Sequence, residues 1–163
     1  MKYLALITII LSFSCKNKHM EKCDKSYSIQ VWNINASRAF VNLYAISEDS
    51  ISITFLGGVV GDTERVLYGK ALSQEERLDL CDWLGSIDID TLKTEYINKA
   101  VEDGNQKKVE IILGSKTKTI YVSNFYQKDL GELFNVINMI VKDERYKIRY
   151  QSNYTGSVLI RGK

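Results

Sequence analysis

The residue types that carry hydrolytic and metal chemistry are sparse in this chain. Its single histidine, His19, lies four residues after Cys15 in a lysine-rich stretch. A Ser-His-Asp or Cys-His site needs an imidazole that the fold holds in position. A zinc site of histidine and cysteine needs about four ligands, and beyond Cys15 the chain offers only Cys23 and Cys81. We therefore interpret His19 as a solvated linker residue, and we expect neither an imidazole-dependent active site nor a metal or other cofactor.

Carboxylates are the remaining candidates for binding a cation. Asp88 and Asp90 alternate along an extended segment, and residues 102–105 (Glu-Asp-Gly-Asn) place oxygen atoms on a turn. Calcium takes about six to eight oxygen ligands, and its twelve-residue loop carries spaced acids and a terminal glutamate. Neither stretch has that pattern. Asp103-Gly104 is therefore interpreted as a turn chosen for its backbone geometry, and no metal site is predicted.

A carboxylate pair would also suit glycoside hydrolysis, in which one acid protonates the leaving group and the other attacks or activates water. The two groups must lie roughly 5–10 Å apart across a cleft, and nothing in the sequence brings two acids to that separation. A carboxylate-based hydrolase is therefore a minor alternative. Its candidate residues are Glu75, Glu76, Asp88, Asp90, Glu102 and Asp103.

Two other kinds of segment are suited to contacting a partner. The glycine-rich run over residues 57–62 lacks the Gly-Lys-Ser/Thr ending of a phosphate loop, so it predicts a flexible connection. Tyrosine is enriched at interfaces because it buries area and keeps a polar tip, although the rim of a small core is the simpler interpretation of these tyrosines. The expected contact residues are Gly57, Gly58, Asp62, Asp103, Gly104, Tyr146, Tyr150 and Tyr154.

The amino end has the order of a secretory signal over residues 1–14. Lys2 is followed by an apolar run over residues 3–13, which is shorter than the roughly 17–25 residues of a spanning helix. Leu11-Ser12-Phe13-Ser14-Cys15 resembles the relaxed lipoboxes of Bacteroidota, with Phe13 departing from the stricter Leu-Ala-Gly-Cys form. The resemblance implies cleavage before Cys15, a diacylglyceryl group on its thiol, and anchorage in a lipid bilayer.

The residues after Cys15 bear on the location of the protein. Lys16 stands where an inner-membrane retention signal has aspartate, which favours the outer membrane. Asn17-Lys18 does not match the acidic surface-export signal of some Bacteroidota lipoproteins, so the periplasmic face is expected. Residues 15–26 form a basic tether, interpreted as a solvated linker, with contact to anionic headgroups as the alternative. Its lysines are Lys16, Lys18, Lys22 and Lys25.

Overall charge argues against a nucleic-acid partner. The 22 lysines and arginines nearly balance the 20 acidic residues, so the chain lacks the basic field that phosphate binding requires.

Cys23 and Cys81 admit two interpretations. An oxidising compartment permits them to pair. Cys81, however, shares an expected helix face with Leu78 and Leu84, so a buried free thiol that packs as a small hydrophobe is favoured.

Hydrophobic patterning predicts the elements that position these residues. A capping box at Ser73–Glu76 opens a helix that ends at Gly85. Residues 87–96 follow as an irregular or extended return, and a second helix covers about 127–141 with apolar positions at i, i+3, i+4 and i+7. Strands are expected over residues 26–33, 38–46, 51–56, 64–68, 109–113 and 119–122, with hairpin turns at residues 47–50 and 114–116 and a last strand starting at Ile148 and Tyr150.

This order predicts a single α+β domain over residues 27–163, an antiparallel sheet with two amphipathic helices packed on one face. The likeness to uncharacterised small Bacteroidota lipoproteins spans roughly residues 65–150. That group carries no assigned activity, so the resemblance implies location and no particular reaction. The residues that carry it are Leu72-Ser73, Leu92–Tyr96, Asp103-Gly104, Leu130 and Ile137-Asn138.

A tethered domain without a catalytic constellation predicts a non-catalytic binding or interaction module of the envelope. One version is a periplasmic immunity or inhibitor protein that occludes the active site of a toxin. An accessory subunit of an envelope complex and the carboxylate-based hydrolase are the alternatives. The expected partners are the lipid bilayer at Cys15 and an envelope or periplasmic protein.

Overall fold

The computed structural model describes residue 23 and residues 25–35, 40–57, 63–101 and 104–150. Within these residues the chain forms one seven-stranded sheet with two α-helices, which is the expected α+β class. No helix among them is both long enough and apolar enough to cross a bilayer. Several residues singled out from the sequence lie outside the described residues, namely Cys15, His19, Gly58, Asp62, Glu102, Asp103 and Tyr154.

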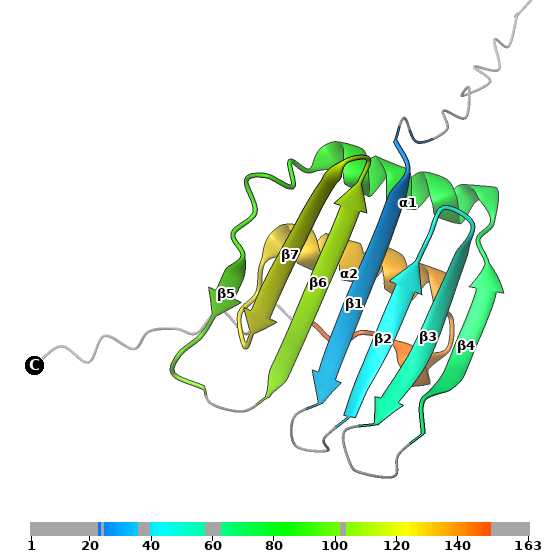
Figure 1. Cartoon of the computed structure of the whole chain (residues 1–163). Helices are drawn as coiled ribbons and strands as arrows, with labels where there is room; N and C mark the ends of the chain where they lie inside the picture. Colours follow the sequence, from blue (N-terminus) through cyan, green and yellow to red (C-terminus); the bar gives the residue numbers. More distant parts are fainter. Residues whose placement is uncertain (1–22, 24, 36–39, 58–62, 102–103, 151–163) are drawn as a thin grey trace, which may run out of the picture.

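The strand order across the sheet is β4-β3-β2-β1-β6-β7-β5 (Figure 1). Neighbouring strands are antiparallel except for β5, which runs parallel to β7, so the sheet is mixed where an antiparallel one was predicted. The reason is the path of the chain, which leaves α1 at the top of the sheet in Figure 1 and descends along the edge beside β7. The strands are β1 (Tyr27–Asn35), β2 (Phe40–Ile46), β3 (Ser50–Gly57), β4 (Arg65–Ala71), β5 (Glu95–Ile97), β6 (Asn105–Leu113) and β7 (Lys116–Ser123).

Both helices, α1 (Gln74–Ser86) and α2 (Lys128–Ile140), lie behind the sheet in Figure 1 and cover the same face. They are joined where the indole Nε1 of Trp83 donates to the carbonyl of Asp129 at 3.0 Å. The apolar stripe of α2 is buried as predicted from its i, i+3, i+4 spacing. Its buried residues are Leu130, Gly131, Leu133, Phe134, Ile137 and Ile140.

Alternation along the strands separates a covered face from an open face. In β1 the side chains of Ile29 and Val31 are fully buried, whereas Trp32 keeps some exposure. Ile29 pairs with Ile46 on β2 and with Ile111 on β6, and all three are buried. Because side chains directly opposite each other in a ladder share a face, this register makes the helix side the core, and no described helix or strand covers the other side.

The start of α1 confirms the capping box. The Ser73 hydroxyl accepts from the Glu76 amide at 3.3 Å, and the Glu76 carboxylate accepts from the Ser73 amide at 2.8 Å. The helix continues one residue past Gly85, to Ser86. Of the face predicted as Leu78, Cys81 and Leu84, Leu84 is buried, whereas Leu78 and Cys81 are only partly buried. Trp83, whose indole bonds to Asp129 of α2, is buried beside Leu84 instead. The buried residues are Leu80, Trp83 and Leu84.

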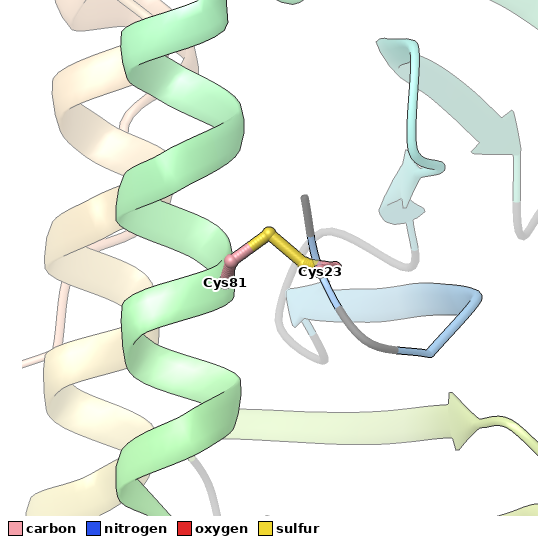
Figure 2. Close-up of a disulfide and its surroundings, with 2 residues drawn as sticks. All are labelled: Cys23 and Cys81. Carbon is pink, nitrogen blue, oxygen red and sulfur yellow. A yellow bond between two sulfur atoms is a disulfide. The ribbon is translucent and has the colours of Figure 1, made fainter. Parts of the chain in front are cut away.

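Cys23 and Cys81 form a disulfide, so the favoured interpretation of Cys81 as a free thiol is wrong (Figure 2). The chain before β1 passes alongside α1 and brings the two Cα atoms to 5.4 Å, within the range a disulfide requires. The bridge spans 58 residues, and loop-closure entropy for a loop of that length corresponds to about 4 kcal/mol. The bridge fixes the chain just before β1 to α1.

The last described segment is not the predicted strand. After α2 the chain forms a 3-10 helix over Glu144–Tyr146 and then runs irregularly to Tyr150. Ile148 is buried, which explains its strand-like pattern, yet its backbone bonds to a side chain and not to a ladder. The Asn138 amide accepts from the Ile148 N–H at 2.7 Å and donates to the Ile148 carbonyl at 2.9 Å.

Candidate functional site

The open face of the sheet has an unusual composition. The outward positions of β1, β2 and β3 hold no charged residue, although Asp, Glu, Lys and Arg make up 26% of the chain. Depletion of charge is the compositional mark of the centre of a protein interface. These outward residues are Ser28, Gln30, Trp32, Ile34, Val41, Leu43, Ala45, Ser52, Thr54 and Leu56.

Apolar side chains gather at one end of this face. Trp32 lies opposite Leu43, Ile34 opposite Val41, and Val41 opposite Leu56. Opposed side chains in a ladder have Cβ atoms roughly 4.5–5.5 Å apart, so the group is contiguous. Val66 on edge strand β4, opposite Thr54, adds a side chain that is 70% exposed. We call this group the apolar patch; it comprises Trp32, Ile34, Val41, Leu43, Leu56 and Val66.

Charged and polar groups border the patch on β6 and β7. The Lys108 ammonium lies 4.1 Å from the centre of the Trp32 ring, within cation–π distance. Lys108 also pairs with Glu110 at 3.8 Å, and Tyr121 lies opposite Lys108 on β7. An apolar centre beside a charged border is the anatomy of a protein-binding surface.

The covered face, by contrast, contains a buried amine. Lys107 is only 1% exposed, and its ammonium donates to the amide oxygens of Asn33, at 2.9 Å, and Asn105. The ring centres of Phe134 and Tyr150 each lie 5.8 Å from the Lys107 Nζ. Burial lowers the pKa of Lys107 to about 7, because removal from water disfavours the charged form.

The structure separates the contact residues predicted from the sequence. Gly57 ends β3 opposite Phe40, one residue beyond Leu56 of the patch. Tyr146 and Tyr150 lie on the covered face, where Tyr150 packs edge-on against Phe134 with centroids 4.9 Å apart. Their placement favours the core-rim interpretation of these two tyrosines.

Gly104 occupies a position that suits glycine. Its φ is 130°, and a Cβ there would approach the Asn124 side-chain oxygen to 2.5 Å. Gly104 therefore serves the local backbone at the start of β6.

Three of the acids considered for hydrolysis or metal binding, Glu76, Asp88 and Asp90, have structural partners. Glu76 caps α1 and pairs with Lys70 at 2.6 Å. Asp90 is bonded to Lys116, which lowers the pKa of that carboxyl, and Asp88 accepts from the Asp90 amide at 3.1 Å. Among the described residues, no group of three or more His, Cys, Asp or Glu side chains is placed to hold a metal ion.

Sequence reasoning missed both the apolar patch and Lys107. Once Val109 and Ile111 are known to point inward, a period of two places Lys107 inward as well. The outward set follows from the same period once the inward face is known.

Comparison of the sequence with known proteins finds no family model that matches the chain and no curated protein that matches it.

Proposed function

We propose that the protein is a lipid-anchored envelope protein whose folded domain binds a protein partner through the apolar patch and catalyses no reaction. One observation carries this proposal. Within the part of the chain that the structure describes, the helices cover one face of the sheet, and the outward positions of β1, β2 and β3 on the other face hold no charge. Apolar side chains left in water favour association with another apolar surface.

The chemistry of the open face favours a protein over other occupants. Anionic headgroups and nucleic acids are bound through lysine and arginine, which the outward positions of β1 to β3 lack. The complementary partner surface is uncharged and apolar at its centre. At its border it carries polar groups that meet Lys108, Glu110 and the half-exposed Tyr121.

The position of the patch relative to the expected anchor supports the same choice. Cys23, the described residue nearest Cys15 in sequence, is bonded to α1 at the end of the sheet where β1 begins. Trp32 and Ile34 lie towards the other end of β1. At roughly 3.3 Å per residue, the path from Tyr27 to Ile34 covers about 20 Å, so the patch is displayed away from the residue nearest the anchor.

The experiment places a charge in the patch and compares it with a matched charge elsewhere. Val66→Lys alters an exposed side chain of the patch, and Met139→Lys alters one that is 60% exposed on α2. The acylated protein and both variants are purified from native envelopes after crosslinking. We expect one stoichiometric protein partner with the parent chain and with Met139→Lys, and at least a tenfold loss with Val66→Lys.

Other occupants give distinct outcomes that would overturn the proposal. Self-association of the parent chain that Val66→Lys abolishes would identify a second copy as the occupant. Patch-dependent binding of the Cys15→Ser protein to phosphatidylglycerol vesicles would identify the bilayer. Equal partner recovery from both variants would remove the patch from the binding site.

The anchor has its own test. Cys15→Ser is expected to accumulate as unprocessed precursor without acyl label, because the modified thiol is missing. Unchanged incorporation of radiolabelled palmitate in Cys15→Ser would refute lipidation at this residue and leave the test of the patch unaffected.

A further inference from the structure

Within the described residues, Lys107 lacks the carboxylate partner that a buried cation ordinarily has. Fully buried lysines are rare unless they are paired with a carboxylate. Among the described residues, no acidic side chain forms an ion pair with Lys107. Its amine meets two neutral amide oxygens and two aromatic rings instead. The protonated form is therefore solvated only by these neutral groups when the structure is closed.

The segment that closes over this amine is held by side chains. We call residues 143–150 the C-terminal strap. The Tyr44 hydroxyl donates to the Tyr146 carbonyl at 2.6 Å, and the Asn138 side chain makes two bonds to the Ile148 backbone. The strap ends at Tyr150, whose hydroxyl accepts from the Gln127 amide at 2.7 Å. An attachment of a few side-chain bonds is expected to open at lower free energy than a strand of the sheet.

Asn105 joins the amine and the strap directly. Its side-chain oxygen accepts from Lys107, and its side-chain nitrogen donates to the Arg149 carbonyl at 2.8 Å. The Tyr150 ring forms a second link, because it covers the amine and belongs to the strap. Lys107 is 1% exposed, and two of the groups that contact its amine, Asn105 and Tyr150, also hold or belong to the strap.

We propose that the C-terminal strap is a pH-responsive latch, which opens when Lys107 is protonated and closes when its amine is neutral. Opening lets water solvate the ammonium, and the neutral amine tolerates enclosure by Phe134 and Tyr150. Binding of the proton and opening of the strap are thus linked equilibria.

Among the described groups around the Lys107 amine, only the amine itself changes charge near neutral pH. Asn33 on β1, Asn105 on β6 and Phe134 on α2 do not titrate. Tyr150 on the strap faces it directly, and burial raises the pKa of Tyr150 to about 12. Tyr44, on β2 beside Asn33, likewise has its pKa raised by burial to about 12. Of the charged strap residues, Arg145 pairs with Asp143 and Lys147 pairs with Glu144, while Arg149 is exposed.

The direction and size of the effect follow from the linkage. Enclosed Lys107 has a pKa of about 7, against 10.5 for a solvated lysine. The ratio of open to closed strap is therefore expected to rise by up to about 30-fold when the pH falls from 8.5 to 6.

Hydrogen exchange of the whole chain, with its disulfide formed, measures this ratio. Exchange of the strap amides is followed at pH 8.5 and pH 6 and divided by the intrinsic exchange rate at each pH. We expect strap protection to fall by up to about 30-fold at pH 6 and to stay well below that of the core amides of Val31 and Val109, which exchange through global unfolding, at both pH values. Equal strap protection at the two pH values, or strap protection as high as that of the core amides, would overturn the latch.

Two variants test whether the titration of Lys107 causes the pH response. Lys107→Met fills the same space without a titrating group and should abolish the pH dependence of strap protection. Asn33→Asp places a carboxylate against the amine without touching the strap, so Lys107 stays charged across the range and the dependence should again disappear. Lys108→Met, on the open face, is the matched control and should keep it. A full pH response in Lys107→Met or in Asn33→Asp contradicts the proposal.

Discussion

The two faces of the sheet reverse the usual distribution of charge and apolar surface. The covered face encloses the amine of Lys107, and the open face displays Trp32 and its apolar neighbours. The two features lie back to back on β1 and β6, since Asn33 pairs with Lys107 and the preceding Trp32 pairs with Lys108. A shift of one residue along either strand therefore changes both the environment and the role of a side chain.

Neither the buried lysine nor the exposed apolar cluster is what folding stability by itself would favour. A lysine in the core costs free energy that an apolar residue of the same size would not, and an apolar cluster in water contributes little to the fold. Such local departures are expected at functional sites. The covered face is thus interpreted as the core with one switchable group, and the open face as a surface kept for a partner.

The largest expected change in the free energy of unfolding comes from comparing two adjacent isoleucines of β6, one on each face. Ile111 is fully buried on the covered face, whereas Ile112 is 37% exposed on the open face. Ile111→Ala is expected to lower the free energy of unfolding by about 3–4 kcal/mol, because it leaves a cavity among the helices. Ile112→Ala should lower it by about 1 kcal/mol or less. Urea denaturation at constant m-value measures both, and similar losses would break the comparison.

The next effect concerns two adjacent lysines. Lys107 has a lowered pKa in the folded protein, so the unfolded chain binds more protons above pH 7. The stability contribution of Lys107 therefore rises as the pH increases from about 7 towards 10.5. Relative to Lys107→Met, the parent chain should gain about 2–3 kcal/mol in free energy of unfolding between pH 6 and pH 9.

Lys108→Met is the control for this measurement and should retain the parent pH dependence. Denaturation curves for the three proteins at pH 6 and pH 9 measure the difference. A titration of the Lys107 side chain by NMR checks its cause. A midpoint near 10.5 would show that the amine is solvated and would remove the contrast between the two lysines.

Much of the scaffold could be predicted because its determinants are local. The capping box at Ser73–Glu76, the turn before Lys116 and the stripe of α2 each follow from neighbouring residues. The Cys23–Cys81 bridge could not, because it depends on the path of the chain beside α1. The strap was mistaken for a strand because its backbone bonds come from distant side chains such as Asn138 and Tyr44.

The candidate site was missed for a different reason. Ile111 and Ile112 are adjacent, so β6 by itself does not reveal which residue points inward. Pairing with β1 settles the choice, because Ile29 meets Ile111 and Val31 meets Val109. Only after this pairing is known do Lys107 and Trp32 fall on the faces where they are unexpected.

The smallest effect tests the border of the patch, where Lys108 lies over Trp32. Lys108→Met keeps the aliphatic contact and removes the cation, so a loss of about 0.5–1 kcal/mol in free energy of unfolding is expected. In a Trp83→Phe background Trp32 is the single tryptophan, and acrylamide quenching of its selectively excited fluorescence should increase once the cation is gone. If quenching stays the same while stability falls, the lysine supports the sheet and does not fix the indole. If both stay the same, Trp32 is not held in position in the free protein, and the partner must order it on binding.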